Sequence, residues 1–249
     1  MVKHYSNFNI KKKHKGSIIL IGNFDGLHQG HQKLFKLAQS YKRKYNLKIG
    51  VINFDPMPKM FFSKKLKNFR LSNVEQKIKL LSKFKVDFVI TKIFDKKFSK
   101  IKALNFIIEI LKKKLNSKFI FVSNNFKFGN NREGNVSLLI ENEKNCNYKV
   151  VKPKPLTKGK KIISSSLIRN LLENGFLDKA NKLLNRNWTI EGIVQKGRQV
   201  GKKIGFPTCN IDIHDYVLAK PGVYAVKVLR KNNTKYLRGI ANLGFRPTF

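Results

Sequence analysis

Cysteine is scarce in this sequence, and its scarcity argues against two classes of small protein. The 249 residues include two cysteines, Cys146 and Cys209, which lie far apart and form no Cys-x-x-Cys pair. A disulfide scaffold needs several paired cysteines, and a structural zinc site needs clustered cysteine or histidine ligands. We therefore expect a fold without disulfides or zinc, in which both thiols are buried or incidental.

Long hydrophobic runs are also missing. The longest, such as residues 18–21, fall far short of the roughly 18 to 20 apolar residues that a membrane-spanning helix requires. Residues 1–15 carry lysines but no apolar stretch or small-residue cleavage pattern of a secretory signal. We expect a cytoplasmic protein without a membrane partner. Its 41% hydrophobic residues allow one large or two modest domains.

Acidic residues are few: 14 Asp and Glu face 53 Lys and Arg, which gives a formal net charge of +39. Such an excess attracts polyanions such as nucleic acid. However, lysine, asparagine, isoleucine and phenylalanine share A/T-rich codons, and the lysines are scattered through nearly every segment. A dedicated binding stripe would gather them on one element with arginine or aromatic residues. Charge alone therefore assigns no function, and a basic nucleic-acid-binding protein remains an alternative.

Apolar periodicity predicts an α/β protein. Residues 17–21 are apolar and β-branched, so they form a strand that enters a turn-rich stretch. From His31 onward apolar residues recur at helical spacing, and residues 48–54 form a second strand that Pro56 and Pro58 end. Strand, helix and strand together predict a βαβ unit.

The same alternation continues along the chain. It predicts a helix over 74–84, strands over 86–91 and 118–122, and between these strands a helix with an apolar face. That face consists of Leu104, Ile107, Ile108, Leu111 and Leu115. We expect a parallel sheet with helices on both faces and ligands at the carboxyl ends of its strands. The loops at those ends are 22–31, 54–58 and 123–134.

The pattern changes in the last third of the chain. Residues 164–166 open a helix, because serine is a favourable N-cap, and a second short helix follows over 177–184. From Trp188 onward short strands are predicted over 188–195, 222–229 and 236–242, with a hairpin turn at Asn232-Asn233. We place a boundary near Asn187, which predicts an α/β domain over 1–187 and a smaller β domain over 188–249.

The segment from Gly22 to His31 directly follows the first strand and begins a helix. It holds His28 and His31, whose spacing of three places both rings on one helical face. A helix N-terminus offers free N–H groups and a positive dipole end that attract phosphate, and glycines let the backbone approach. The two histidines are therefore predicted to donate hydrogen bonds to a phosphate as negative charge builds in an in-line displacement, without a covalent intermediate.

His28-Gln29-Gly30-His31 resembles the signature of the His-x-Gly-His nucleotidyltransferase superfamily. The resemblance implies a Rossmann-like sheet and nucleotidyl transfer from a nucleoside triphosphate. The predicted ATP-binding residues of the loop are Gly22, Asn23, Phe24, Asp25, Gly26, His28 and His31. The loop leaves the acceptor open, because pantetheine-phosphate, nicotinamide-mononucleotide and glycerol-phosphate transferases look similar here.

Three further motifs, over 53–58, 121–129 and 163–169, narrow the acceptor. In order and spacing they resemble the bacterial bifunctional riboflavin kinase/FMN adenylyltransferases, and the resemblance runs from about residue 17 to residue 249. It implies transfer of AMP from ATP to FMN, giving FAD and pyrophosphate. It also implies a flavin pocket in which a flat ring system stacks on aromatic side chains. Its residues are Pro56, Pro58, Phe62, Asn125 and Phe128.

Alternatives remain open for this pocket. Its phenylalanines are otherwise ordinary core residues, and another phosphate monoester is the alternative acceptor. Ser123, Asn124 and Lys127 stand where the family usually has glycine, often an acidic residue, and commonly arginine. Lysine in place of arginine removes a fork-shaped hydrogen-bond donor. The sequence therefore defines the reaction type better than the affinity of the pocket.

Ser164, Ser165, Ser166 and Arg169 form the last motif of the first domain. The serines by themselves are sufficient as a helix cap. Together with Arg169 and the free N–H groups of the helix they predict a second anion site. We assign that site to the β and γ phosphates of ATP, which leave as pyrophosphate.

Residues 197–210 are similar to the riboflavin kinase signature of a small antiparallel β-barrel. Gly201 and Gly205 suit a flap that covers phosphates, and the resemblance gives Thr208 and Asn210 the roles of holding Mg²⁺ and ATP phosphate oxygens. Oxygen ligands suit magnesium. The alternative is a plain Gly-Pro turn between two strands.

Residues 239–249 also match that family, in which further strands, a catalytic glutamate and a helix follow. From this we expect an incomplete barrel whose kinase activity is absent or weak. An open barrel has an exposed sheet edge, which favours self-association. Riboflavin, FMN and ATP are thus the expected small-molecule partners.

Overall fold

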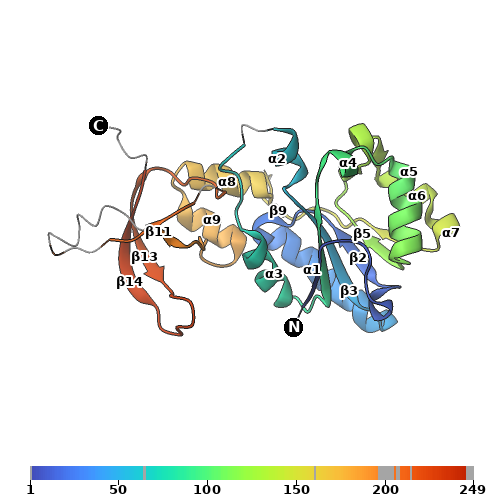
Figure 1. The fold of residues 1–249 in the computed structure, drawn as a ribbon, viewed down its shortest axis with the longest axis horizontal. Helices are drawn as coiled ribbons and strands as arrows, with labels where there is room; N and C mark the ends of the chain where they lie inside the picture. Colours follow the sequence, from blue (N-terminus) through green and yellow to red (C-terminus); the bar gives the residue numbers. More distant parts are fainter. Residues whose placement is uncertain are drawn as a thin grey trace.

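The computed structural model describes residues 2–63, 66–159, 161–195, 205, 208–213 and 215–244 (Figure 1). Its centre is a six-stranded sheet in the order β1-β4-β3-β2-β5-β8, in which every neighbouring pair is parallel. The strands are β1 (Lys3–Tyr5), β2 (Ile18–Ile21), β3 (Ile49–Asp55), β4 (Phe88–Ile93), β5 (Phe119–Phe121) and β8 (Lys149–Val151). The predicted parallel α/β sheet is confirmed.

The order of the strands fixes where a ligand belongs. From β2 the chain adds β3 and then β4 on one side, and it places β5 on the other side of β2. The direction of winding therefore changes at β2. In open parallel sheets ligands bind at such a switch point, outside the carboxyl ends of the strands. The loop after Ile21 lies at that point.

Helices cover both faces of the sheet. Ile18 and Leu20 of β2 pack in one core with α1 (Gln29–Tyr45) and α3 (Val74–Ser82). Ile19 and Ile21 point to the opposite face, where a second core includes α5 (Ala103–Asn105), η3 (Phe106–Lys114) and α6 (Val136–Glu141). Because β2 is buried on both sides, it reads as a continuous apolar run rather than an alternating one.

One predicted helix face is partly wrong. Leu104 and Ile108 were assigned to the buried side, but their exposed fractions are 48% and 37%. The helix from Phe106 to Lys114 is a π-helix, and the N–H of Leu115 that closes it donates to the carbonyl of Ile110, five residues earlier. The wider turn shifts the buried positions away from the spacing of an α-helix. The buried apolar residues are Phe106, Ile107, Ile110, Leu111 and Leu115.

After the sheet the chain forms α8 (Ser165–Glu173) and α9 (Leu177–Leu184), as predicted. Two antiparallel pairs follow: β11 (Val194–Gln195) with β12 (Asn210–Ile211), and β13 (Gly222–Val228) with β14 (Leu237–Leu243). The strand predicted over 188–195 is shorter than expected. Among the described residues these two pairs do not close into a barrel, so the barrel stays a prediction.

The remaining elements are short and lie mostly in connections. They are η1 (Lys12–His14), η2 (Asp25–Leu27), α2 (Pro58–Phe62), α4 (Lys96–Ser99), β6 (Lys127–Phe128), η4 (Asn130–Arg132), β7 (Gly134–Asn135), α7 (Glu143–Cys146), β9 (Thr157–Lys158) and β10 (Lys161–Ile162). In the described part of the chain, no helix combines the length and the apolar character needed to cross a membrane.

Residues 215–219 tie the C-terminal part to the α/β part. Arg70 donates its N–H to the carbonyl of Asp215 at 2.8 Å, and Val217 donates its N–H to the carbonyl of Arg70 at 2.8 Å. Val217 and Ala219 share a core with α8 and α9. In Figure 1 the β13–β14 hairpin lies beyond those helices, at the end of the molecule far from the sheet. The predicted boundary at Asn187 stays a prediction, since the core is continuous across it.

The contact between Gly50 and Phe88 gives a stability prediction. Gly50 of β3 is in register with Phe88 of β4, and a Cβ on Gly50 would lie 2.2 Å from the Phe88 ring. That ring is held by stacking on His14, with centroids 4.6 Å apart. We expect Gly50→Ala to lower the free energy of unfolding by about 1–3 kcal/mol, the usual cost of overpacking. Urea denaturation measures the change.

Gly239→Ala is the matched control, because a Cβ on that strand glycine would meet its nearest neighbour at 3.7 Å, an ordinary contact. We expect a change of at most about 0.5 kcal/mol there, typical of sites away from special features. Equal stability of the Gly50→Ala variant and the wild type would contradict the packing described for β3 and β4.

Candidate active site

The loop after β2 folds through two conformations that most residues avoid. Phe24 has φ 47°, and Gly26 in η2 has φ 75°. A Cβ on Gly26 would lie 2.8 Å from the Leu71 side chain, so both backbone angle and space require glycine there. The chain then leaves η2 with His28 as the N-cap of α1. This short path places both predicted histidines at the start of a 17-residue helix.

The rings of His28 and His31 stack on each other, with centroids 3.7 Å apart and planes 23° from parallel. The predicted placement on one side of the helix is confirmed. Burial lowers the pKa of His28 to about 4, and burial, with smaller contributions from His28 and Lys77, lowers the pKa of His31 well below its usual value. Both imidazoles are therefore neutral near pH 7, and each has one N–H to donate.

Buried polar atoms without partners surround these rings. Among the described residues, no hydrogen-bond partner is present for the Nδ1 atoms of His28 and His31, the Oδ1 of Asn23, or either amide atom of Asn53. A buried polar group left unpaired costs about 1–3 kcal/mol. Such groups gathered at the carboxyl ends of β2 and β3 are typical of a site that a polar ligand completes.

Asn53 is a candidate site residue that the sequence did not single out. It is 1% exposed and lies on β3, two residues after Val51. Since alternate strand residues share a face, Asn53 faces the side of the sheet that α1 and α3 cover. Within the motif over 53–58, only its position at the end of a strand could have indicated this role.

Asp25 connects three segments of the site. Its carboxylate accepts hydrogen bonds from the backbone N–H groups of Leu71 and Ser72 and forms an ion pair of 2.6 Å with Arg169 of α8. Arg169 also donates through Nε to the carbonyl of Phe69 at 2.6 Å and lies 3.7 Å above the ring of that residue. The two residues are 2% and 8% exposed.

Arg169 is therefore already engaged in the structure. Its Nη2 and Nε have protein partners, and its guanidinium stacks on an aromatic ring. The predicted contact of Arg169 with the β and γ phosphates stays a prediction. The contacts in place hold α8 against η2.

The predicted serines lie at the N-terminus of α8, but they differ in their surroundings. Ser164 caps the helix by accepting the N–H of Leu167, and the Ser165 hydroxyl donates to the carbonyl of Asp25 at 2.9 Å. Ser166 is exposed. Gly30 in the first turn of α1 is so close that its Cβ would lie 3.3 Å from the carbonyl oxygen of Ile163. The N-termini of two helices thus meet, and both favour an anion.

The predicted flavin residues lie on two loops. Pro56 follows β3 through a cis peptide bond, and Pro58 is the first residue of α2. Phe62 at the end of α2 is 70% exposed, whereas Phe128 is 8% exposed. Asn125 is exposed and its side chain lies 3.0 Å from the Ser123 hydroxyl. The structure does not bring Phe62 and Phe128 into direct contact.

A series of ring contacts joins these two phenylalanines. Successive centroids lie 5.8 Å apart for Phe62 and Phe94, 5.7 Å for Phe94 and Phe98, and 6.5 Å for Phe98 and Phe106. Phe106 then lies 5.5 Å from Phe128. The alternative that these phenylalanines are core residues holds for Phe128 by burial. It does not hold for Phe62, whose exposed ring is free to stack on a ligand.

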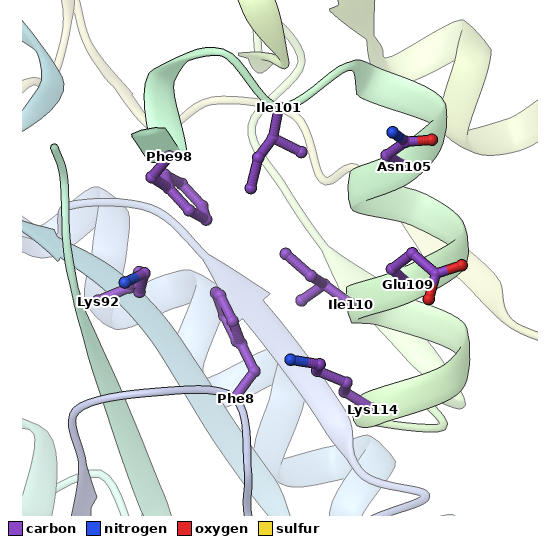
Figure 2. A pocket seen from close by; sticks show the side chains of 8 residues that line it. All are labelled: Phe8, Lys92, Phe98, Ile101, Asn105, Glu109, Ile110 and Lys114. Carbon is purple, nitrogen blue, oxygen red and sulfur yellow. The ribbon is translucent and has the colours of Figure 1, made fainter. Parts of the chain in front are cut away.

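Two open cavities occur elsewhere on the described surface. One of about 300 Å³ lies beside the same phenylalanine series, where Phe8, Phe98, Ile101 and Ile110 give it an apolar lining and charged side chains stand at its rim (Figure 2). The other, of about 350 Å³, is lined by Gln29, Gln32, Lys33, Lys36, Leu156 and Asn185. Neither includes the histidine pair. The chemistry therefore identifies the site better than the volume of open space does.

The predicted kinase residues are placed in part. Gly201 lies outside the described residues, and Gly205 has φ 81°. Thr208 and Asn210 are exposed and two residues apart, and Asn210 begins β12. Their hydroxyl and amide oxygens are of the kind that Mg²⁺ accepts. Within the described residues, no cluster of three or more His, Cys, Asp or Glu side chains forms a metal site.

Comparisons with known proteins assign both halves of the chain. A family described as FAD synthetase matches residues 10–167, and a family described as riboflavin kinase matches residues 184–249. The chain is 40% identical over 242 residues to the bifunctional riboflavin kinase/FMN adenylyltransferase of Buchnera aphidicola subsp. Schizaphis graminum, covering 97% of this chain and 77% of that protein. The Escherichia coli K12 protein of the same name is 37% identical, with 94% and 74% covered.

A solved structure supports the fold. The crystal structure described as that of a macrolide-efflux protein from Streptococcus pneumoniae matches with a TM-score of 0.82 and 28% sequence identity, covering 100% of this chain and 80% of that chain. The efflux function named in that description belongs to that protein and is not transferred to this chain. The riboflavin kinase match over residues 184–249 shows that this domain is present, so the expectation of an absent or weak kinase is unsupported.

The lowered pKa of His28 predicts a pH-dependent loss of stability. The folded value is about 4 and the ordinary value is 6.5, so between these pH values the unfolded chain binds a proton that the folded chain does not. Stability therefore falls as pH falls through this range, by about 3 kcal/mol for a shift of this size. We expect His28→Gln to reduce this loss, as measured by urea denaturation at several pH values.

His4→Gln is the control, since His4 is exposed and bonds the Thr91 hydroxyl at 2.8 Å. This variant shows how much of any change comes from replacing a histidine by glutamine at an exposed position. If His28→Gln and wild type lose the same free energy between these pH values, His28 is not buried in its neutral form.

Proposed function

This chain belongs to the family of bifunctional riboflavin kinase/FMN adenylyltransferases, and on that basis we propose that it transfers AMP from ATP to FMN, giving FAD and pyrophosphate. The observation that carries the proposal is the stacked, neutral pair of His28 and His31 where the N-termini of α1 and α8 meet. Phosphate binding accounts for both the histidine pair and the meeting of the two helix N-termini, because free backbone N–H groups and uncharged hydrogen-bond donors gather at one point.

The reaction is an in-line displacement at the α phosphorus of ATP. A phosphate oxygen of FMN forms the new P–O bond, the bond from the α phosphorus to the oxygen bridging to the β phosphate breaks, and pyrophosphate leaves with that electron pair. No enzyme nucleophile is needed. We assign His28 and His31 to donate hydrogen bonds to the α phosphate oxygens, where preorganised donors stabilise the charge of the transition state.

We assign the loop from Gly22 to Gly26 to the part of the site that holds the phosphates and the ribose of ATP. Asn23 brings an unpaired amide oxygen there, and Gly26 lets the backbone turn beneath the ligand. Asp25 acts through its partners, because it fixes Arg169 and the start of α8. The serines of α8 add a capped helix N-terminus to the same anion site.

The flavin is proposed to bind between the loop of Pro56, Pro58 and Phe62 and the loop of Asn125 and Phe128. Phe62 offers an exposed ring, and the phenylalanine series behind it gives an apolar wall. In the C-terminal part, Thr208 and Asn210 are proposed to hold Mg²⁺ with ATP phosphates during riboflavin phosphorylation. A cytoplasmic location and self-association through the hairpin edge stay predictions.

The proposed function predicts FAD formation from purified protein, ATP, Mg²⁺ and FMN, followed by chromatography of the flavins. We expect His28→Ala and His31→Ala each to lower kcat by about 100-fold or more, as loss of a transition-state donor does, while FMN binding changes little. FMN binding is measured by quenching of flavin fluorescence. His4→Ala serves as an exposed histidine control.

No FAD from folded wild-type protein would refute the function. FAD formation unaffected in both site variants would refute the role of the histidines and leave the function standing.

A second assay tests the kinase half. With riboflavin, ATP and Mg²⁺ as the only substrates, we expect FMN to appear first and FAD later, because the FMN made by one half is the substrate of the other. Thr208→Ala should remove the FMN step and leave FAD formation from added FMN intact. Failure to form FMN from riboflavin, with FAD still made from FMN, would limit the chain to adenylyl transfer.

A further inference from the structure

Lys77 on α3 is an unusual lysine. It is 2% exposed and ranks among the largest fully buried side chains of the described structure. Lysine is almost never fully buried unless its charge is paired. Lys79, two residues later on the same helix, is exposed and pairs with Glu191 at 3.0 Å, as a surface lysine does.

The helix directs Lys77 into the molecule. Leu81, one turn later on the same face, is buried in the core that α3 shares with α1 and the sheet. Asp25, Asp55 and Arg70 lie close enough to interact electrostatically with the Lys77 ammonium, and that ammonium in turn lowers the pKa of His31. Lys77 is therefore buried on the side of the sheet that Asn53 also faces, within electrostatic range of His31.

The acidic groups near Lys77 already have partners. Asp25 pairs with Arg169 and Asp55 pairs with Arg70, each at 2.6 Å. Arg70 also lies 3.6 Å from Asp215, which is largely exposed, and Arg186 adds another cation near Asp25. Among the described residues, no carboxylate forms an ion pair with Lys77. Three carboxylates thus face four cationic side chains, and the histidines are neutral.

A buried charge without a counterion is strongly unfavourable, and the usual remedy is a partner of opposite sign. The amide of Asn53 and the Nδ1 atoms of the two histidines have no hydrogen-bond partner among the described residues, and Lys77 is buried within electrostatic range of His31, Asp25 and Asp55. A phosphate is anionic and accepts hydrogen bonds, so it can pair with the Lys77 ammonium and accept from the Asn53 amide nitrogen and from the histidine N–H groups.

We propose that Lys77 binds a phosphate group of the reactants in the adenylyl-transfer site. The proposal rests on the proposed function for the identity of those reactants, and it concerns ATP and FMN alike, because each brings phosphate to this point. In this proposal Lys77 adds a positive charge from a separate helix, α3, to the hydrogen-bond donors of the two histidines. Lys77 is thus a binding residue that the sequence did not indicate.

The test compares Lys77→Met with Lys79→Met, which removes an exposed lysine from the same helix. Binding of ATP, FMN and riboflavin is titrated separately, ATP by calorimetry and the flavins by fluorescence quenching. We expect Lys77→Met to weaken ATP or FMN binding by about tenfold or more, the usual effect of losing a charge-assisted hydrogen bond. Riboflavin, which has no phosphate, should bind each variant as it binds the wild type.

The two sources of phosphate are separated by which titration changes. Weaker ATP binding alone places Lys77 on the nucleotide, weaker FMN binding with unchanged riboflavin binding places it on the flavin phosphate, and both together indicate a shared position. Unchanged affinity for both ligands overturns the proposal, even if kcat falls. Equal weakening of riboflavin binding also overturns it, because the effect would then not depend on phosphate.

Thermal denaturation without ligand gives an independent result. Since Lys77→Met removes an unpaired buried charge, we expect Tm of the ligand-free variant to equal or exceed that of the wild type, whereas the rise in Tm caused by ATP becomes smaller. A lysine with only a structural function would instead lower the ligand-free Tm and leave the rise in Tm caused by ATP unchanged, and that combination overturns the proposal.

Lys77→Gln provides a polar replacement if Lys77→Met does not yield folded protein, and the same titrations apply to it. These binding measurements need no turnover. If the wild type binds ATP and makes no FAD, the proposed function fails while the role of Lys77 in phosphate binding is still decided.

Discussion

The buried carboxylate of Asp25 is the interaction on which the rest of the site depends. It accepts the N–H groups of Leu71 and Ser72, pairs with Arg169, and its backbone carbonyl accepts the Ser165 hydroxyl. These contacts join η2, the segment before α3, and α8. Breaking a buried ion pair from one side costs about 3–5 kcal/mol, because the other charge is left behind. The geometry of the proposed phosphate site is therefore tied to the stability of the fold.

The contacts of Asp25 explain why the strained loop after β2 keeps its conformation. Phe24 and Gly26 have positive φ, and a loop of this kind persists when its surroundings determine it. Here the surroundings are Leu71 against Gly26 and the Asp25 network on either side. The result sets His28 at the first turn of α1 and brings the start of α8 beside it. Two elements about 140 residues apart in sequence therefore meet at the proposed anion site.

The sequence predicted those parts of the site that local patterns encode. The βαβ unit, the histidine spacing and the serine cap of α8 depend on neighbours within a few residues, and all three are present. Contacts between residues that are far apart in the sequence leave no such local pattern. Arg169 gives no sign in sequence that it meets Asp25, and Lys77 is one lysine among many. The π-helix over 106–114 and the three-residue edge strands β1 and β8 are set by tertiary packing, so periodicity alone missed them.

Because the two histidines are neutral, the proposed site needs other groups to supply positive charge. Two imidazolium rings stacked 3.7 Å apart would repel each other, and burial prevents either from charging near pH 7. In the proposed function, neutral donors would orient a phosphate without attracting it over distance. The proposed sources of that attraction are the N-termini of α1 and α8 and the buried Lys77. In the proposed site, the charge for binding would thus come partly from α8 and α3, whereas the donors for the transition state, His28 and His31, lie at the start of α1.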